Sequence, residues 1–236
     1  MNRRSGMRRG FVGLLSSLLL LFGAVGAASS EAPLILSLGD DQYLPKGAIQ
    51  GGTGAQFLSE LGSRKLEEVQ LVILSNLDYL SLPAPLRDGL VEHVRKGGSL
   101  LITGGNRSFG SGGYGKTKLE EILPFAILYP RDWVPTRRGL VEPVAPNHPA
   151  LSGLDVLKMP YVGTFNNLAL APGSTLIAQL AILYRQPLMA ERSVGNGLCF
   201  GIAFDMREIS GQWAEKDQFS LNLIRYLLRR SGGSSR

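Results

Sequence analysis

The sequence is poor in the residues that build disulfides and metal centres. Its 236 residues include one cysteine, Cys199, so no disulfide can form within the chain. Cys199 lies in the apolar run LCFGIAF, which is typical of an unreactive core thiol. The only histidines are His93 and His148, and neither has a second ligand at metal-binding spacing. We therefore predict no metal site and no cofactor.

The sequence also lacks a charge pattern typical of nucleic-acid binding. The formal net charge is +6, but residues 1–27 contain four arginines and no acidic residue. Without that segment the chain has 21 basic and 19 acidic residues and is close to neutral. A nearly neutral domain without a basic stripe gives no electrostatic footprint for a nucleic acid, so we exclude this class of partner.

The first 27 residues have the pattern of a secretory signal peptide. Arg3, Arg4, Arg8 and Arg9 precede a leucine-rich apolar run at residues 11–25, and small residues follow at cleavage spacing. The run is too short and too often broken by glycine and serine for a membrane span of about 20 residues. We expect export to the periplasm or the cell exterior, with an uncleaved N-terminal anchor as the alternative. The predicted organisation is a signal peptide at 1–27, one domain at 28–230 and a disordered tail at 231–236.

Three short apolar runs predict the centre of an α/β fold. Residues 33–38, 69–75 and 99–103 are apolar on both faces, as in parallel strands covered by helices on both sides. Helices are expected between them at residues 53–61 and 83–96. The alternation of strands and helices predicts a doubly wound, mostly parallel sheet.

The helix predicted at residues 83–96 has one apolar stripe. Leu86, Leu90 and Val94 recur every four residues, and Gly97 follows the last turn. His93 falls on the polar side of this pattern, so we expect a surface histidine without a ligand role.

The second half of the chain is less regular. A short helix is predicted at residues 117–123, and eight prolines from 124 to 172 indicate an extended excursion with short strands at 125–172. Later predicted elements are strands at 174–181, 187–191 and 198–204, the last two joined as a hairpin, and a closing helix at 217–229.

Polar residues follow several of the predicted strands. In open α/β sheets, ligands bind outside the carboxyl ends of the strands, so these residues should surround one crevice. The alternative is that Asp40 and Asn76 only cap turns. The candidate ligand-binding residues are Asp40, Asp41, Asn76, Thr103, Asn106, Arg107, Ser108 and Asp205.

The segment from Gly110 to Thr117 matches the phosphate-loop pattern G-x-x-x-x-G-K-T. A working phosphate loop needs a strand that leads directly into the first glycine and a proper helix after the lysine. Here residues 104–109 separate the strand from Gly110, and Pro124 stops the helix early. Nucleotide binding at Gly110–Thr117 therefore stays a remote alternative.

Several sequence blocks resemble the putative glutamine amidotransferase-like family, which belongs to the class I glutamine amidotransferase-like superfamily. The blocks are LVEHVRKGGSLLITGGNRSF at 90–109, GGYG at 112–115, LEEILP at 119–124, NHP at 147–149, and residues 187–213. The resemblance covers roughly residues 33–230 and implies a flavodoxin-like core.

The resemblance also implies a lost active site. True amidotransferases end this strand in G-x-C-x-G, and Thr103 stands where their catalytic cysteine would be. No histidine follows His148, so the histidine and glutamate of a Cys-His-Glu triad have no match. The resemblance therefore implies no glutaminase activity, and it implies a protein partner in the cell envelope.

Two classes of function follow from these observations. The leading hypothesis is an exported, catalytically degenerate domain that binds a partner or small ligand at the strand-end crevice. The alternative is a hydrolase of a small or carbohydrate-like substrate, with Asp40, Asp205 or His148 as the acid or base.

Overall fold

The computed structural model describes residues 31–181, 185–209 and 211–231. The predicted signal peptide and the predicted tail from residue 232 lie outside the described residues. No helix in the described part of the chain combines the length and apolar character that crossing a membrane requires.

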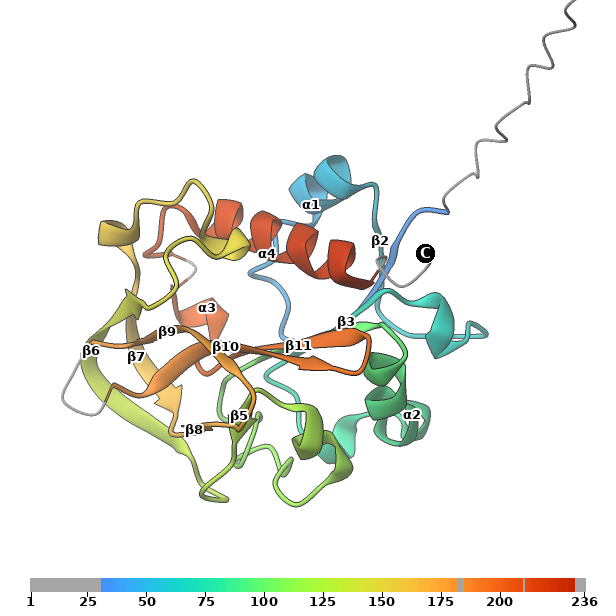
Figure 1. Ribbon diagram of the computed structural model, residues 1–236, viewed down its shortest axis with the longest axis horizontal. Helices are drawn as coiled ribbons and strands as arrows, with labels where there is room; N and C mark the ends of the chain where they lie inside the picture. The colour runs from blue at the N-terminus through green and yellow to red at the C-terminus, as the bar shows by residue number, and fades with distance from the viewer. Residues whose placement is uncertain (1–30, 182–184, 210, 232–236) are drawn as a thin grey trace, which may run out of the picture. The chain divides into compact units, whose positions relative to one another are not determined.

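Within the described residues, nine strands form one mixed sheet (Figure 1). One half is parallel and has the order β2-β1-β3-β4-β11. The other half continues as β10-β9-β6-β7 and is antiparallel. The parallel strands are β2 (Gln56–Leu58), β1 (Leu34–Gly39), β3 (Leu71–Ser75), β4 (Ser99–Thr103) and β11 (Gly197–Ile202). The antiparallel strands are β10 (Pro187–Val194), β9 (Thr175–Leu180), β6 (Trp133–Pro143) and β7 (Tyr161–Asn166).

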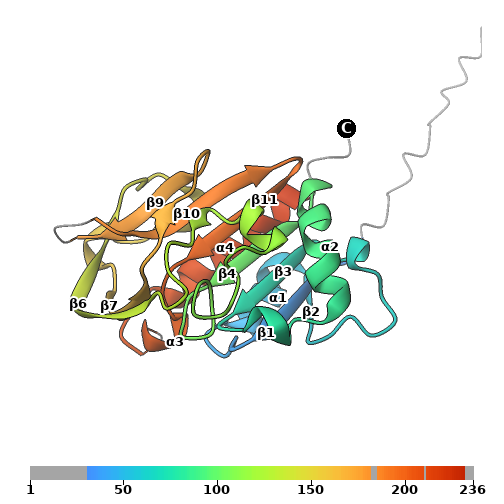
Figure 2. The same ribbon diagram turned by 90° about the horizontal axis from the view of Figure 1, so that it is seen from below.

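Helices cover both faces of the parallel half. Helices α1 (Lys46–Thr53) and α4 (Lys216–Ser231) lie on one face, and α2 (Ala84–Arg95) lies on the other (Figures 1 and 2). The short helix α3 (Met206–Ile209) follows β11, and β5 (Phe125–Ala126) pairs with β8 (Ala169–Leu170) in a separate small sheet. Single 3₁₀ turns make up the remaining elements: η1 (Leu66–Glu68), η2 (Tyr79–Ser81), η3 (Lys118–Ile122), η4 (Pro149–Leu151) and η5 (Val156–Lys158).

The central strands form because both of their faces are buried. All five residues of β3 and all five of β4 are buried, as their unbroken apolar sequences predict. Ser99 on β4 donates a hydrogen bond to the Leu227 carbonyl of α4 and so ties that helix to the sheet. Cys199 on β11 is fully buried and burial raises the pKa of its thiol, which confirms an unreactive core cysteine.

One sequence-based prediction of secondary structure is wrong. Residues 53–61 are not a helix: α1 ends at Thr53, Gly54 is left-handed with φ of 71°, and β2 then pairs with β1. The pairing of β2 with β1 outweighs local helix propensity here. The glycines inside α1 lower its helix propensity, so sequence analysis did not predict that helix. The short helix predicted at residues 117–123 is present as a 3₁₀ helix at residues 118–122.

The sheet is also less parallel than predicted. The proline-rich excursion contributes β6, which has 11 residues and joins the main sheet between β9 and β7. The register of β6 against β7 shifts between Pro135 and Gly139. This bulge lets β6 continue past Pro135. The hairpin of β10 and β11 and the closing helix α4 are confirmed.

The prediction of a surface His93 is wrong. Its side chain is buried, only 7% of the residue is exposed, and the ring packs over Gly98. Burial lowers the pKa of His93 from 6.5 to about 4, although Glu67 nearby acts to raise it. The imidazole is therefore neutral at neutral pH.

This burial predicts a pH-dependent stability. As the pH falls below about 6.5, the unfolded chain binds a proton at His93, whereas the folded chain does so only near pH 4. Stability should fall through this window by roughly 3 kcal/mol, and the neutral variant His93→Gln should lack this component. Urea unfolding at several pH values from 7 to 4 measures the free energy of unfolding of both proteins. An equal loss of stability in the native protein and in His93→Gln would show that His93 is not its cause.

Candidate functional site

The carboxyl ends of the parallel strands meet at one edge of the sheet. In the register, Gly39 faces Ser75, and Thr103 faces both Ser75 and Ile202. The residues that follow β1, β3, β4 and β11 therefore lie next to one another. This is the edge at which the candidate residues were expected to surround a crevice.

Side chains with hydroxyl groups are buried at this strand-end edge. The Tyr43 hydroxyl lies 3.0 Å from Ser75 Oγ, and the side chains of Ser75 and Thr103 both act to lower the Tyr43 pKa. Tyr43, Ser75 and Thr103 are at most 4% exposed. Burial raises the Tyr43 pKa well above its ordinary value, so the phenol stays protonated.

Asn76 links two sides of the crevice. Its Nδ2 donates to Asp40 Oδ2 at 2.9 Å, and its Oδ1 accepts from the backbone N–H of Arg107 at 2.9 Å. Asn76 has φ of 45°, a left-handed conformation that asparagine tolerates better than most residues. Gly105 passes so close that a Cβ there would lie 2.1 Å from Asn76 Oδ1. Glycine is therefore required at position 105.

The acidic side chains of the crevice are paired with cations. Arg207 Nη1 lies 2.9 Å from Asp40 Oδ2, and Arg207 Nη2 lies 2.5 Å from Asp205 Oδ2. The hydrogen bonds to Asp205 raise the pKa of Arg207, so the guanidinium stays charged. Asp41 accepts from Ser37 Oγ and pairs with Lys46 Nζ at 2.8 Å.

A buried carboxylate fastens the glycine-rich loop that follows β4. Asp132 is fully buried and accepts from the N–H groups of Gly110 and Ser111 and from Ser111 Oγ, all within 2.9 Å. Asn166, also fully buried, donates to Asp132 Oδ1 and accepts from the Gly105 N–H. The loop amides therefore already bind an anion that the protein supplies.

This arrangement opposes the phosphate-loop alternative. The Gly110 N–H binds Asp132, and the Lys116 N–H binds Glu120 Oε2 at 2.6 Å. Thr117 donates its hydroxyl to the Tyr114 carbonyl, and the helix that follows is the 3₁₀ helix η3. The segment Gly110–Thr117 thus has neither the free amides nor the α-helix that phosphate binding needs.

Only part of the loop reaches the surface. Asn106 and Arg107 are exposed, and Arg107 Nε donates to Asp78 Oδ2 at 2.7 Å. Ser108 is buried and donates its hydroxyl to the Thr103 carbonyl. Asn106 and Arg107 are therefore the loop side chains that a bound molecule would meet first.

His148 lies away from this site. Its Nδ1 accepts from the Ala150 N–H, its Nε2 lies 3.2 Å from Glu191 Oε2, and its ring packs on Phe200 and Tyr226. Tyr226 is on α4, so this cluster lies between that helix and the sheet. Burial acts to raise the Glu191 pKa, but hydrogen bonds from His148 and Tyr226 hold it below the ordinary value. Both nitrogens of His148 thus have structural partners.

The hydrolase alternative gains no support from these contacts. Asp40 and Asp205 share one guanidinium, and His148 belongs to a different cluster. A general acid and base must both reach a common substrate position. The three residues do not form such a group.

Sequence analysis missed four residues that organise this edge: Tyr43, Asp132, Asn166 and Arg207. Arg207 follows Asp205 by two positions, and Tyr43 follows Asp40 by three, so proximity in sequence was an available signal for these two. Asp132 and Asn166 belong to the irregular excursion and match no motif. Their role depends on tertiary contacts with residues 105–111.

Comparisons with known proteins agree on the type of fold. Residues 34–227 match the model of a family described as GATase1_like, putative glutamine amidotransferase. No curated protein matches the chain.

Solved structures with similar folds have low sequence identity. Cytoplasmic Protein STM3548 from Salmonella typhimurium is 16% identical, with a TM-score of 0.68 over 83% of this chain and 98% of that chain. Cytoplasmic Protein STM1381 from Salmonella typhimurium LT2 is 17% identical, with a TM-score of 0.69 over 82% and 99% of the two chains. A β-galactosidase from Rahnella sp. R3 is 14% identical, with a TM-score of 0.52, and the match spans 84% of this chain but 32% of that enzyme. At these identities the likeness is one of fold alone.

The Asp132 network predicts a large loss of stability on truncation. Asp132→Ala leaves the Gly110 and Ser111 N–H groups without an acceptor and removes one acceptor of the Asn166 amide, so unfolding should become easier by about 3 kcal/mol. Ser111→Ala removes one hydroxyl of the network and should cost about 1 kcal/mol. The exposed ion pair provides the control, because Asp78→Ala should change stability by less than about 1 kcal/mol. Urea unfolding measures all three, and an Asp132→Ala protein as stable as Asp78→Ala would contradict the analysis.

Proposed function

Because this chain belongs to the putative glutamine amidotransferase family, we propose that it is a catalytically degenerate member that binds a ligand at the strand-end crevice. The single observation that carries the proposal is the state of Thr103. The residue is only 2% exposed, and its side chain lies beside the buried Tyr43 hydroxyl. A nucleophile must reach its substrate, and this hydroxyl does not.

The backbone at Thr103 supports the same conclusion. In α/β enzymes a nucleophile at a strand end sits on a sharp, strained turn that exposes its side chain. Among the described non-glycine residues, positive φ occurs at Asn76, Phe109, Lys116, Arg138 and Arg185, and not at Thr103. The strained position of this edge is Asn76, whose side chain is used to join Asp40 to the loop.

The absence of a base completes the argument for degeneracy. Nucleophilic catalysis needs an adjacent base that is itself oriented by a third group. His93 precedes β4, at the other end of that strand from Thr103, and His148 is bound to Glu191 and Ala150. Neither imidazole is positioned to activate Thr103.

The accessible part of the crevice suits an oxyanion-bearing ligand. Arg107 is about half exposed, and its Nε is fixed by Asp78, which leaves the outer edge of the guanidinium facing the surface beside Asn106. A guanidinium oriented in this way is a good partner for carboxylate groups. A small carboxylate or an acidic segment of a partner protein has this chemistry.

The finer description of the fold is part of this proposal. The parallel half has the order β2-β1-β3-β4-β11, which corresponds to the flavodoxin-like order 2-1-3-4-5. In that class of sheet, ligands bind at the carboxyl ends of the strands. This supports a flavodoxin-like core whose ligand-binding edge has been kept while its chemistry has been lost.

The catalytic half of the proposal is tested by a glutaminase assay. The purified chain and the variant Thr103→Cys should both release no ammonia from glutamine above the buffer rate, because a buried thiol without a base gains no reactivity. Ammonia release by the native chain that Thr103→Ala abolishes would overturn the proposal.

The binding half of the same test uses malonate as a dicarboxylate probe. Malonate should raise the midpoint of thermal unfolding of the native chain, and Arg107→Gln should lose most of that increase. Lys118→Gln, an exposed substitution on η3, is the matched control. An increase of equal size in all three proteins would show a nonspecific salt effect and contradict binding at the crevice.

Export is the second part of the proposal and rests on the sequence of residues 1–27 alone. If the leader is a cleaved signal, expression of the full chain in a bacterium should give a secreted product that begins near Ala28. Replacing Leu18 and Leu19 by arginine should break the apolar run and keep the protein in the cytoplasm unprocessed. N-terminal sequencing of the fractionated proteins measures this. A cytoplasmic native product that still begins with residue 1 would contradict export.

A further inference from the structure

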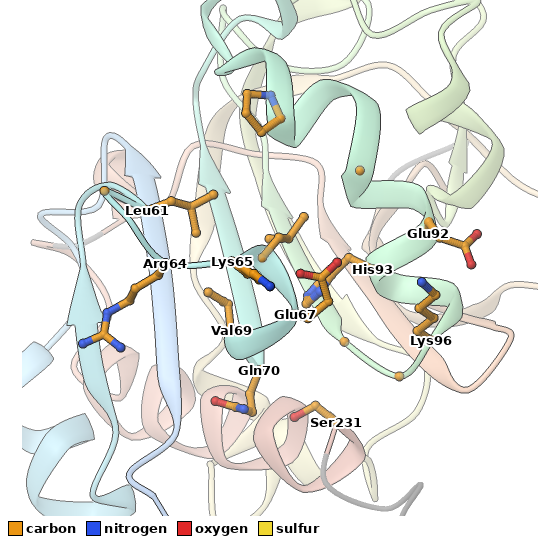
Figure 3. Close-up of a pocket in the computed structure, with 16 residues that line it drawn as sticks. Leu61, Arg64, Lys65, Glu67, Val69, Gln70, Glu92, His93, Lys96 and Ser231 are labelled. Atoms are coloured by element: carbon orange, nitrogen blue, oxygen red, sulfur yellow. The ribbon is translucent and has the colours of Figure 1, made fainter.

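A second candidate site lies at the opposite edge of the sheet. A cavity of about 720 Å³ opens between the segment 61–70 and helix α2 (Figure 3). Val69 and Gln70 immediately precede β3, and Gly97 and Gly98 immediately precede β4. The cavity is therefore at the amino ends of these strands, away from the strand-end crevice. Its volume is in the range of sites for small organic molecules.

Charges of both signs line this cavity without being paired to each other. Lys65 and Glu67 belong to the wall around η1, Glu92 is on α2, and Lys96 directly follows α2. None of the four has a salt-bridge partner among the residues that the structure describes. Arg64, by contrast, pairs with Glu68 and points away from the centre of the cavity in Figure 3. Two amines and two carboxylates are thus available to a ligand.

His93 supplies an unpartnered polar group at the inner wall. Its residue is 7% exposed, its Nε2 is buried without a hydrogen bond, and no other hydrogen bond of the ring occurs in the described part of the chain. A Cβ at Gly98 would lie 2.1 Å from Nε2, so the ring can occupy this wall only because residue 98 is glycine. A buried polar group without a partner is costly, and such groups call for a functional explanation.

Apolar side chains form another part of the cavity lining. Leu61, Leu66, Val69 and Pro85 line it, and Gly89 adds no side chain to its α2 wall. An apolar body could therefore be enclosed between these side chains while charged ends meet the lysines and glutamates. This combination of surfaces is typical of small-molecule sites, which are mostly apolar with a few polar groups that fix orientation.

We propose that this cavity binds a small zwitterion with an apolar body, of the class of an apolar amino acid or dipeptide. Its carboxylate meets Lys65 and Lys96, its ammonium group meets Glu67 and Glu92, and its hydrocarbon part packs on Leu61 and Leu66. The His93 ring forms part of the cavity wall beside the ligand. The assignment does not depend on the proposed function, since the two sites lie at opposite ends of the same strands.

The experiment is an NMR titration that follows the side-chain nitrogens of the two histidines. The probes are L-leucine, L-leucyl-L-leucine and the uncharged N-acetyl-L-leucinamide. The zwitterions should shift the His93 signals in a saturable way and leave those of His148, which lies under α4, unchanged. Comparing leucine with the dipeptide shows which size the cavity takes. N-acetyl-L-leucinamide, which lacks both charges, should produce no saturable shift.

Variants distinguish a site that recognises the charges of the ligand from a groove that binds only its apolar part. Lys65 and Lys96 are exposed, so Lys65→Gln/Lys96→Gln leaves the core intact and should weaken zwitterion binding by about tenfold or more. Lys116→Gln, on the glycine-rich loop, is the control and should bind as the native chain does. The proposal is overturned if His93 does not shift with either zwitterion, if the uncharged amide shifts it equally, or if the double variant binds unchanged.

Discussion

One buried carboxylate determines how the strand-end edge of this protein is built. Asp132 lies in the core and needs donors, and the glycine-rich loop after β4 supplies its amide N–H groups and the Ser111 hydroxyl. Asn166 completes the network and connects it to Gly105. The loop is therefore held from inside the protein, and its conformation follows from the need to satisfy a buried charge.

The same principle underlies the proposal that this edge has lost amidotransferase chemistry. The Tyr43 and Ser75 hydroxyls lie 3.0 Å apart beside buried Thr103, and Asp40 and Asp205 bind Arg207. Each polar group that a catalytic site would present to a substrate is here used by a neighbour in the fold. What reaches the surface is a fixed guanidinium and an amide, which suit recognition more than bond breaking.

At the opposite edge of the sheet, around His93, polar groups lack partners among the described residues. His93 is buried without a hydrogen-bond partner, and charged side chains of both signs face a cavity without pairing. The glycines before β4 leave room for the imidazole but supply no group that binds it. The family resemblance points to the strand-end edge. The polar groups without partners lie at the opposite edge, around His93.

Local sequence was sufficient to predict the elements that have a continuous apolar run or a regular spacing of apolar residues. The apolar runs of β1, β3 and β4 and the four-residue stripe of α2 identify the strands and the helix, and the strand-end rule identifies Asp40, Asn76 and Thr103 as neighbours. Edge strand β2, long strand β6 and the roles of Asp132, Asn166 and His93 depended on contacts far apart in sequence. Pairing partners and buried environments are properties of the assembled fold, because a strand needs a neighbouring edge and a buried polar side chain needs a donor from elsewhere. A histidine on the polar side of a helix pattern became a buried one because a glycine five residues later left space for its ring.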